Sequence, residues 1–244
     1  MRDIAKETLD CIAWIQEWFA QKSGNAKGAV VGISGGKDST VVAALLCRAL
    51  GADNVLGVLM PNGEQPDISD SIEVCERLSM PYLTVNIQTA YEGILAEIPN
   101  LSRQTKTNVP PRLRMTVLYA IGQENGYRVA GTGNRSERHV GYCTKWGDTA
   151  CDFNPVANFT SDEVIAIGRE LGLPSELIEK PPSDGLSGLT DEENLGFSYQ
   201  VLNRYIKTGE IDDLETKEKI DRRHAYNLHK TEPIPLYQPS NRLI

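Results

Sequence analysis

The chain has 244 residues, 40% of them hydrophobic and 24% charged, a composition ordinary for a globular protein with one substantial α/β core. Lysine and arginine total 25 against 33 aspartate and glutamate residues, and the net charge of −8 argues against a large nucleic-acid-binding surface. The sequence has no long apolar run and no signal-peptide core at its N-terminus, so we expect a cytoplasmic protein that does not span a membrane.

The first predicted element is an amphipathic helix over about Asp3 to Gln21. Its apolar side chains form one broad face, with Trp18 on that face and Trp14 beside it. Such a face either docks onto the core of its own chain or meets a second subunit. The sequence leaves both possibilities open.

Short β-rich runs then alternate with helical patterns. We expect strands at Ala29–Ile33, Val55–Met60, Tyr82–Ile87 and Tyr127–Gly131, and helices at about Ser39–Leu50, Asp67–Leu78, Thr89–Ala96 and Pro111–Asn125. The alternation predicts an α/β fold, a doubly wound parallel sheet with helices on both faces. Pro110 and Pro111 fit a helix start, where the missing N–H costs nothing. The loops that follow the strands should converge, because ligands bind at the carboxyl ends of such strands.

The loop after the first strand has the composition of a phosphate site. It consists of Gly32, Ile33, Ser34, Gly35, Gly36, Lys37, Asp38 and Ser39. Gly35 and Gly36 permit a tight turn that aims backbone N–H groups at an anion, and the N-terminus of the next helix adds partial positive charge. A carboxylate among phosphates requires a cation between them, so Asp38 is predicted to be a magnesium ligand.

The spacing of this loop is neither that of a Walker A loop nor that of the GxGxxG dinucleotide fingerprint. It resembles the SGGxDS signature of the PP-loop ATP pyrophosphatases. That resemblance implies that the loop holds the pyrophosphate of ATP while an acceptor oxygen attacks the α-phosphorus. The alternative is a plain glycine turn between a strand and a helix.

The loop after the fourth strand, Gly131-Thr-Gly-Asn-Arg-Ser-Glu137, is a candidate second phosphate and metal loop. Its glycines, hydroxyl groups and acid suit that role, and Glu137 would be the second magnesium carboxylate, facing Asp38 across the triphosphate. The alternative is a glycine turn followed by a capped helix.

After Asn154 the pattern changes to short helical segments. Capping boxes at 160–163 and 190–193 each predict a helix start, and proline-rich stretches at 180–183 and 233–235 predict loop or tail. No internal repeat or low-complexity linker is present, so we expect residues 1–244 to form a single domain.

The segment from Gly131 to Pro155 resembles the GTGN(K/R)SE and GYxTKxGD...DxNP segments of the NAD synthetase family. Further matching segments lie at 61–65, 108–115, 180–183, 190–199 and 229–230. The resemblance implies that deamido-NAD, ATP and ammonia are converted into NAD, AMP and pyrophosphate. The nicotinate carboxylate would attack the α-phosphorus of ATP, and ammonia would then displace AMP from the mixed anhydride.

The resemblance also assigns residues to ligands. Besides residues 32–39, the ATP site would include Thr132, Ser161 and Ser183, and Mg²⁺ would bind Asp38 and Glu137. Deamido-NAD would contact Arg112, Lys145, Asp152, His229 and Lys230. Asp38, Lys145 and Asp152 would be the catalytic residues.

Several positions depart from the family pattern. Ser161 stands where a lysine usually contacts the phosphates, and Leu59 stands where many members have an arginine. We therefore expect Lys37, inside the loop, to supply the missing cation. No glutaminase domain is visible, so free ammonia is the expected nitrogen donor, and the family implies a homodimer.

Two other functions remain open at this stage. A PP-loop enzyme that adenylates another acceptor, such as tRNA, would favour cysteine pairs or a basic appended domain, which the sequence does not show. A degenerate ATP-binding sensor would bind ATP without performing chemistry.

Overall fold

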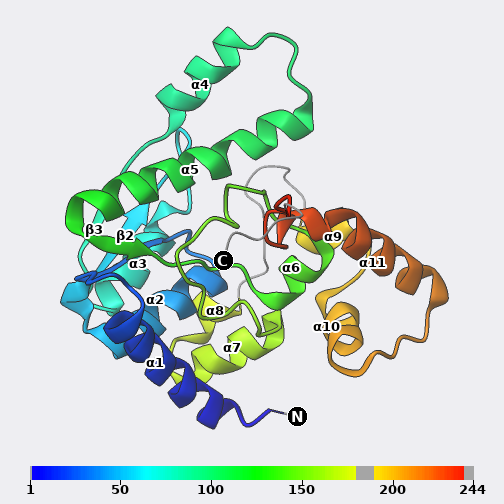
Figure 1. Ribbon diagram of the computed structural model, residues 1–244, viewed down its shortest axis with the longest axis horizontal. Helices are drawn as coiled ribbons and strands as arrows, with labels where there is room; N and C mark the ends of the chain where they lie inside the picture. Colours follow the sequence, from blue (N-terminus) through cyan, green and yellow to red (C-terminus); the bar gives the residue numbers. More distant parts are fainter. Residues whose placement is uncertain (1, 180–189, 239–244) are drawn as a thin grey trace.

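The computed structural model describes residues 2–179 and 190–238 (Figure 1). Its centre is a sheet whose strands, all parallel in the described residues, are β1 (Gly28–Gly32), β2 (Val55–Leu59), β3 (Tyr82–Thr84) and β4 (Tyr127–Val129). The spatial order is β3-β2-β1-β4, so the direction of winding changes between β1 and β4. In open α/β sheets ligands bind outside the carboxyl ends of the strands at such a switch point.

Helices cover both faces of this sheet. The α-helices are α1 (Ile4–Gln21), α2 (Lys37–Leu50), α3 (Ile68–Arg77), α4 (Gln88–Glu97), α5 (Arg103–Asn125), α6 (Arg135–Val140), α7 (Ser161–Glu170), α8 (Ser175–Ile178), α9 (Asp191–Leu195), α10 (Tyr199–Thr208) and α11 (Leu214–Asn227). Two 3₁₀ turns, η1 (Ala52–Asn54) and η2 (Leu228–Lys230), complete the described elements. The predicted doubly wound α/β fold is therefore confirmed.

The two faces of the sheet follow from the alternation of side chains along a strand. On one face Ala29 and Val31 of β1 pack in a core with α1, α2, α3, α7 and α8. On the other face Val30 packs in a smaller core with Val129 of β4 and the apolar side of α5. No described helix is long and apolar enough to cross a membrane.

Helix α5 differs from its prediction, which placed the helix start at Pro110 and Pro111. It begins at Arg103, after the N-cap Ser102 accepts a hydrogen bond from the backbone N–H of Thr105 at 3.2 Å. Both prolines thus lie inside the helix. The helix-start prediction was wrong because Ser102 caps the helix before the prolines are reached, although each proline removes one backbone N–H donor from the helix.

Most of the apolar face of helix α1 packs against the core of its own chain. Ile15 is completely buried, and the ring of Trp18 stacks on Phe153 with centroids 4.6 Å apart. Trp14 is 42% exposed at the edge of this contact. The structure therefore shows docking onto the core for most of this face.

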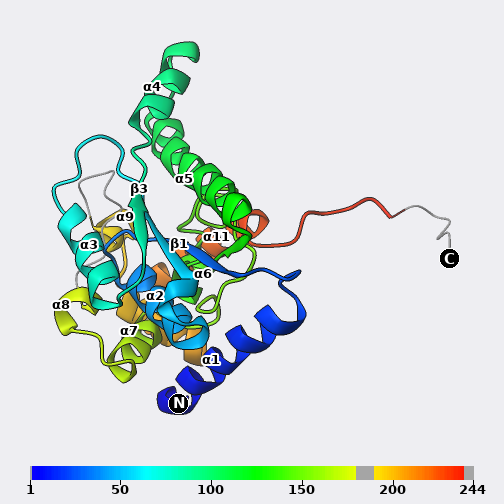
Figure 2. The same ribbon diagram turned by 90° about the vertical axis from the view of Figure 1, so that its left-hand side faces the viewer.

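A third cluster lies away from the sheet, among α6, α9, α10 and α11 (Figures 1 and 2). Its buried apolar residues are Val140, Leu195, Phe197, Tyr199, Leu202 and Ile220. Helix α6 belongs to this cluster and directly follows the loop after β4. The helical cluster therefore borders the switch point of the sheet. Both predicted capping boxes are present, at the starts of α7 and α9.

Candidate active site

The loop from Gly32 to Ser39, here called the phosphate loop, connects β1 to α2 at the switch point. Gly35 has φ of +78°, a left-handed conformation that glycine adopts without strain. A Cβ there would also lie 3.0 Å from the Cβ of Asp70. Ser34 Oγ lies 3.1 Å from Ser39 Oγ and accepts from the backbone N–H of Gly36 at 3.2 Å. The strand, turn and helix that the sequence predicted are all present.

Lys37 and Asp38 form a largely buried ion pair at the start of α2. The Nζ of Lys37 donates to Oδ2 of Asp38 at 2.8 Å, and the lysine side chain is only 6% exposed. Burial by itself lowers the pKa of Lys37, but the carboxylates of Asp38 and Glu137 outweigh it and the pKa is raised. A permanent cation therefore lies within the phosphate loop, where the sequence analysis expected one.

The loop after β4 brings Glu137 to this pair. Asn134 is the N-cap of α6, and its amide group donates to Oδ1 of Asp38 at 3.0 Å. Burial, reinforced by the negative charge of Asp38, raises the pKa of Glu137 above its ordinary value, while Lys37 opposes the rise. One of the two carboxylates predicted to bind magnesium, Asp38, thus raises the pKa of the other, Glu137.

The donor set fits Mg²⁺. No group of three or more histidine, cysteine or acidic side chains that would hold a metal occurs among the described residues. Mg²⁺ is usually held by only one or two carboxylates together with phosphate oxygens and water. Asp38 and Glu137, beside the phosphate loop, would supply such a pair.

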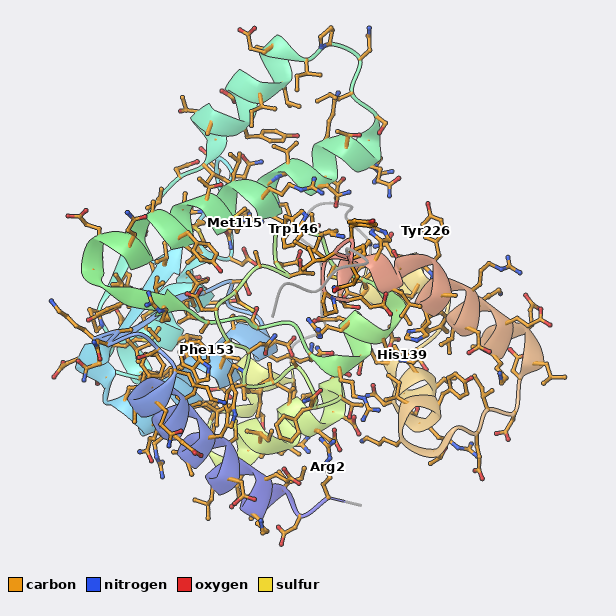
Figure 3. All side chains as sticks on the ribbon, in the orientation of Figure 1. Arg2, Met115, His139, Trp146, Phe153 and Tyr226 are labelled. Carbon is orange, nitrogen blue, oxygen red and sulfur yellow. The ribbon has the colours of Figure 1, made fainter. Side chains whose placement is uncertain are left out.

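A second region, here called the basic groove, lies between the loop after α6, α1 and the segment after η2. It has a volume of about 650 Å³. Its charged lining consists of the cations Arg138, Lys145 and Lys230 and the carboxylates Asp152 and Glu232, and its aromatic side chains are Trp14, Trp18, Trp146 and Phe153. Figure 3 shows Trp146 near α5 and Phe153 near α1.

Of the residues predicted to bind deamido-NAD, Lys145, Asp152 and Lys230 line this groove, and Arg112 and His229 are connected to it through Lys145. Nε of Arg112, on α5, donates to the backbone oxygen of Lys145 at 3.2 Å, and Nζ of Lys145 donates to the backbone oxygen of His229. Lys230 donates to the backbone oxygens of Gly141 and Cys143 at 2.8 and 3.0 Å. Arg112, Lys145 and His229, which are far apart in sequence, are thus joined by hydrogen bonds, and the neighbouring Lys230 is bonded to the loop after α6.

Asp152 is fixed from the sheet side of the groove. Its Oδ2 accepts from the backbone N–H of Val129, in β4, at 2.8 Å, and its Oδ1 lies 3.4 Å from the hydroxyl of Tyr119. Burial, with the Asp152 carboxylate nearby, raises the pKa of Tyr119 to about 12. The phenol is therefore neutral and able to donate at ordinary pH.

Three further residues predicted for the ATP site, Thr132, Ser161 and Ser183, differ in their surroundings. Thr132 lies, partly exposed, between β4 and α6. Ser161 is buried, its Oγ accepts from Nδ2 of Asn203 at 3.0 Å, and its backbone N–H donates to Ser136. Ser183 lies outside the described residues. Ser161 thus lies in a polar network between α7 and α10, and its contact with ATP stays a prediction.

Sequence reasoning missed two side chains at the site. It gave Asn134 no role, although the spacing from Asn134 to Glu137 is that of a capping box with asparagine as N-cap. It also missed Tyr199, whose ring lies 5.8 Å from Nζ of Lys37. No local pattern signals the second contact, because it depends on the packing of α10.

The sequence matches the family described as NAD synthase over residues 10–240. A curated NH(3)-dependent NAD(+) synthetase from Thermococcus sibiricus is 41% identical over 94% of this chain and 90% of its own length. A solved NMN synthetase from Francisella tularensis is 31% identical, with a TM-score of 0.89 over 99% of this chain and 100% of that one. An NH3-dependent NAD synthetase from Campylobacter jejuni has a TM-score of 0.80 at 28% identity, over 98% and 100% of the two chains.

Proposed function

The chain belongs to the NAD synthase family, and from that premise we propose that it is an ammonia-dependent NAD(+) synthetase, a ligase that forms a C–N bond. The nicotinate carboxylate of deamido-NAD attacks the α-phosphorus of ATP, and pyrophosphate leaves. Ammonia then attacks the carbonyl carbon of the resulting mixed anhydride, and AMP leaves. The products are NAD, AMP and pyrophosphate.

In this proposal the phosphate loop binds ATP. The turn at Gly35 and the N-terminus of α2 would face the phosphates, and Lys37 adds a fixed positive charge. Magnesium, held by Asp38 and Glu137, would neutralise charge on the phosphate oxygens during displacement. Thr132, Ser161 and Ser183 are proposed as further ATP contacts.

The basic groove binds the acceptor. Lys145 and Lys230 offer positive charge for its pyrophosphate, Arg112 supports the same loop, and Asp152 offers a carboxylate for sugar hydroxyl groups. The exposed ring of Trp146 offers a surface for a flat heterocycle. Phosphoryl transfer between two polyanions depends on charge neutralisation and in-line positioning more than on an acid or a base.

The observation that carries the proposal is the hydrogen-bonded chain from Arg112 through Lys145 to His229, together with Lys145, Asp152 and Lys230 lining one groove. A plain ATP-binding sensor would have no need of a second cationic groove. An enzyme acting on tRNA would require a more extensive basic surface than a chain of net charge −8 is expected to offer.

An assay of the purified chain with ATP, MgCl₂, ammonium chloride and deamido-NAD tests the proposal. We expect NAD and AMP to form in a ratio of one to one. AMP release without NAD would mean that the activated acceptor does not react with ammonia, and the absence of both products would contradict the proposal. Glutamine replacing ammonium with equal efficiency would contradict the assigned nitrogen donor.

A second acceptor is worth direct comparison. The solved structure with the TM-score of 0.89 is an NMN synthetase, which suggests nicotinate mononucleotide as an alternative substrate. The same chemistry would give nicotinamide mononucleotide. Measuring kcat/KM for deamido-NAD and for nicotinate mononucleotide in parallel decides between them, and a ratio above one in favour of the mononucleotide would replace the first proposal.

We also propose that the chain acts in the cytoplasm as a single domain and as a homodimer. Helix α4 supports the dimer, because it stands out from the body beside α5 (Figures 1 and 2) and none of its residues is buried. Ile98, which follows it, is 49% exposed. Sedimentation at micromolar concentration should show a dimer, and a fully active monomer would contradict this part of the proposal.

A further inference from the structure

The side chain of Asn134 is completely buried between the two carboxylates assigned to magnesium. Its Nδ2 donates to Oδ1 of Asp38 at 3.0 Å. Its Oδ1 accepts from the backbone N–H groups of Ser136 and Glu137 at 2.9 and 3.1 Å. The Oε2 of Glu137 accepts in turn from the backbone N–H of Asn134 at 3.1 Å. One side chain therefore joins α2 to α6.

The orientation of this amide is fixed by its partners. Its oxygen must face the two backbone donors of α6, so its N–H group must face Asp38. Asp38 consequently has a different donor on each oxygen, Asn134 at Oδ1 and Lys37 at Oδ2. The rotation of the Asp38 carboxylate is set by the same residue that starts the helix carrying Glu137.

We propose that Asn134 is a positioning residue that sets the placement of Asp38 and Glu137 for Mg²⁺, an inference that rests on the proposed function. Hydrogen-bond partners of metal-binding carboxylates orient their oxygens, and removing such a partner typically weakens metal binding by 10- to 100-fold. The side chain of Asn134 donates to the Asp38 carboxylate and accepts from the backbone N–H of Glu137, while its backbone N–H donates to the Glu137 carboxylate. Asn134 therefore contacts both residues, directly at Asp38 and through the start of α6 at Glu137.

Two substitutions separate this role from simple helix capping. Asn134→Ser keeps a good N-cap but is too short to donate to Asp38, whereas Asn134→Ala loses both the cap and the donor. Asp213→Ala is the matched control, because it removes the N-cap of α11, where Asp213 accepts from the backbone N–H of Glu215 at 3.1 Å. Only the first two substitutions change the surroundings of Asp38.

The measurement is Mn²⁺ binding to the full chain, by electron paramagnetic resonance, with α,β-methylene-ATP present so that no turnover occurs. We expect both Asn134 variants to bind Mn²⁺ about tenfold more weakly than the wild type. Asn134→Ala and Asp213→Ala should both lower Tm, and Asp213→Ala should bind Mn²⁺ normally. Wild-type affinity in Asn134→Ser would overturn the proposal and leave Asn134 as a cap only.

Asn134→Asp is the second variant if circular dichroism shows that Asn134→Ser is unfolded. It keeps the shape and the cap, but places a carboxylate oxygen against Asp38. We expect the Tm of Asn134→Asp without metal to be lower than that of the wild type. Adding MnCl₂ should raise the Tm of Asn134→Asp by more than it raises the Tm of the wild type. Equal MnCl₂ responses in the two proteins would overturn the proposal.

Failure of the proposed function gives a different result. If the wild type does not bind Mn²⁺, or if it binds Mn²⁺ equally well after Asp38→Asn, then Asp38 is not a metal ligand. Both the metal assignment and the role of Asn134 are then refuted. If the wild type binds Mn²⁺ through Asp38 and only the Asn134 variants behave normally, the metal assignment stands and the positioning role is refuted.

Discussion

The phosphate loop and the basic groove lie beside the same end of the sheet but are held in different ways. The phosphate loop is a continuous stretch of eight residues, 32–39, whose hydrogen bonds mostly join neighbours in sequence, such as Ser34 to Gly36. The basic groove depends on residues from α5, from the loop after α6 and from η2, namely Arg112, Lys145, His229 and Lys230. Changes in the loop should therefore act locally on ATP, whereas the groove should respond to changes in the helices that carry its parts.

Asp38→Asn should have the largest effect, confined to the phosphate loop. It removes a proposed magnesium carboxylate and leaves the buried ammonium of Lys37 without its charged partner. We expect AMP formation to fall by about 10³-fold, or roughly 4 kcal/mol in the barrier. The measurement is the initial rate of AMP release. Asp53→Asn, at an exposed position in η1, is the control, and an equal loss in both would contradict the local assignment.

Lys145→Ala tests the groove. Losing a charge-assisted contact to the acceptor costs about 2 kcal/mol, or roughly 30-fold in its KM. The KM for ATP should change little, because Lys145 contacts Trp146 and His229 rather than the phosphate loop. Initial rates over both substrate concentrations separate the effects. Lys219→Ala, which breaks an exposed ion pair on α11, should leave both constants unchanged. Equal increases in the two KM values would contradict the division of the site.

Gly141→Ala tests whether the groove depends on helix placement. Gly141 has φ of +63°, and a Cβ there would lie 2.0 Å from the Cβ of Asn227, at the end of α11. Displacing α11 would move His229 and Lys230, so we expect roughly a fivefold higher KM for the acceptor, in addition to a loss of about 2 kcal/mol of stability.

Gly209→Ala is the matched control for that change. Gly209 also has a positive φ, of +74°, but a Cβ there meets nothing within 4 Å. Only backbone strain of about 1 kcal/mol should follow, with an unchanged KM for the acceptor. Thermal unfolding and initial rates measure both consequences. Similar KM values in the two variants would mean that the groove does not depend on the position of α11.

Tyr119→Phe should have the smallest effect. The hydroxyl lies 3.4 Å from Asp152, which also accepts a 2.8 Å bond from the backbone of Val129. We expect the acceptor KM to rise less than about threefold, because the shorter bond remains. Since the pKa of Tyr119 is raised to about 12, its protonated form persists to pH 10, and the variant and wild type should share one pH profile between pH 7 and 10. If the rate of the wild type changed between pH 7 and 10 and the rate of Tyr119→Phe did not, the protonated state assigned to Tyr119 would be contradicted.

Several features of the fold were predictable because they depend on local patterns. The strand, turn and helix around residues 32–39 follow from apolar runs and glycines, and the capping boxes at Thr160 and Thr190 follow from a spacing of three residues. The start of α5 was predicted wrongly, because Pro110 and Pro111 also indicate a helix start, whereas the helix begins after the N-cap Ser102.

The sequence by itself determined that the chain has a phosphate loop, a parallel α/β sheet and the side chains of a PP-loop enzyme. The loop and the helix after it depend on residues within one or two turns of each other, whose conformational preferences act locally, and the parallel sheet follows from the alternation of strand and helix patterns along the chain. Only the tertiary structure decided that Asn134 joins Asp38 to the helix of Glu137, that Tyr199 lies beside Lys37, and that Ser161 bonds to Asn203. Each of these contacts spans at least 42 residues, so it exists only once the sheet and the helical cluster have packed together.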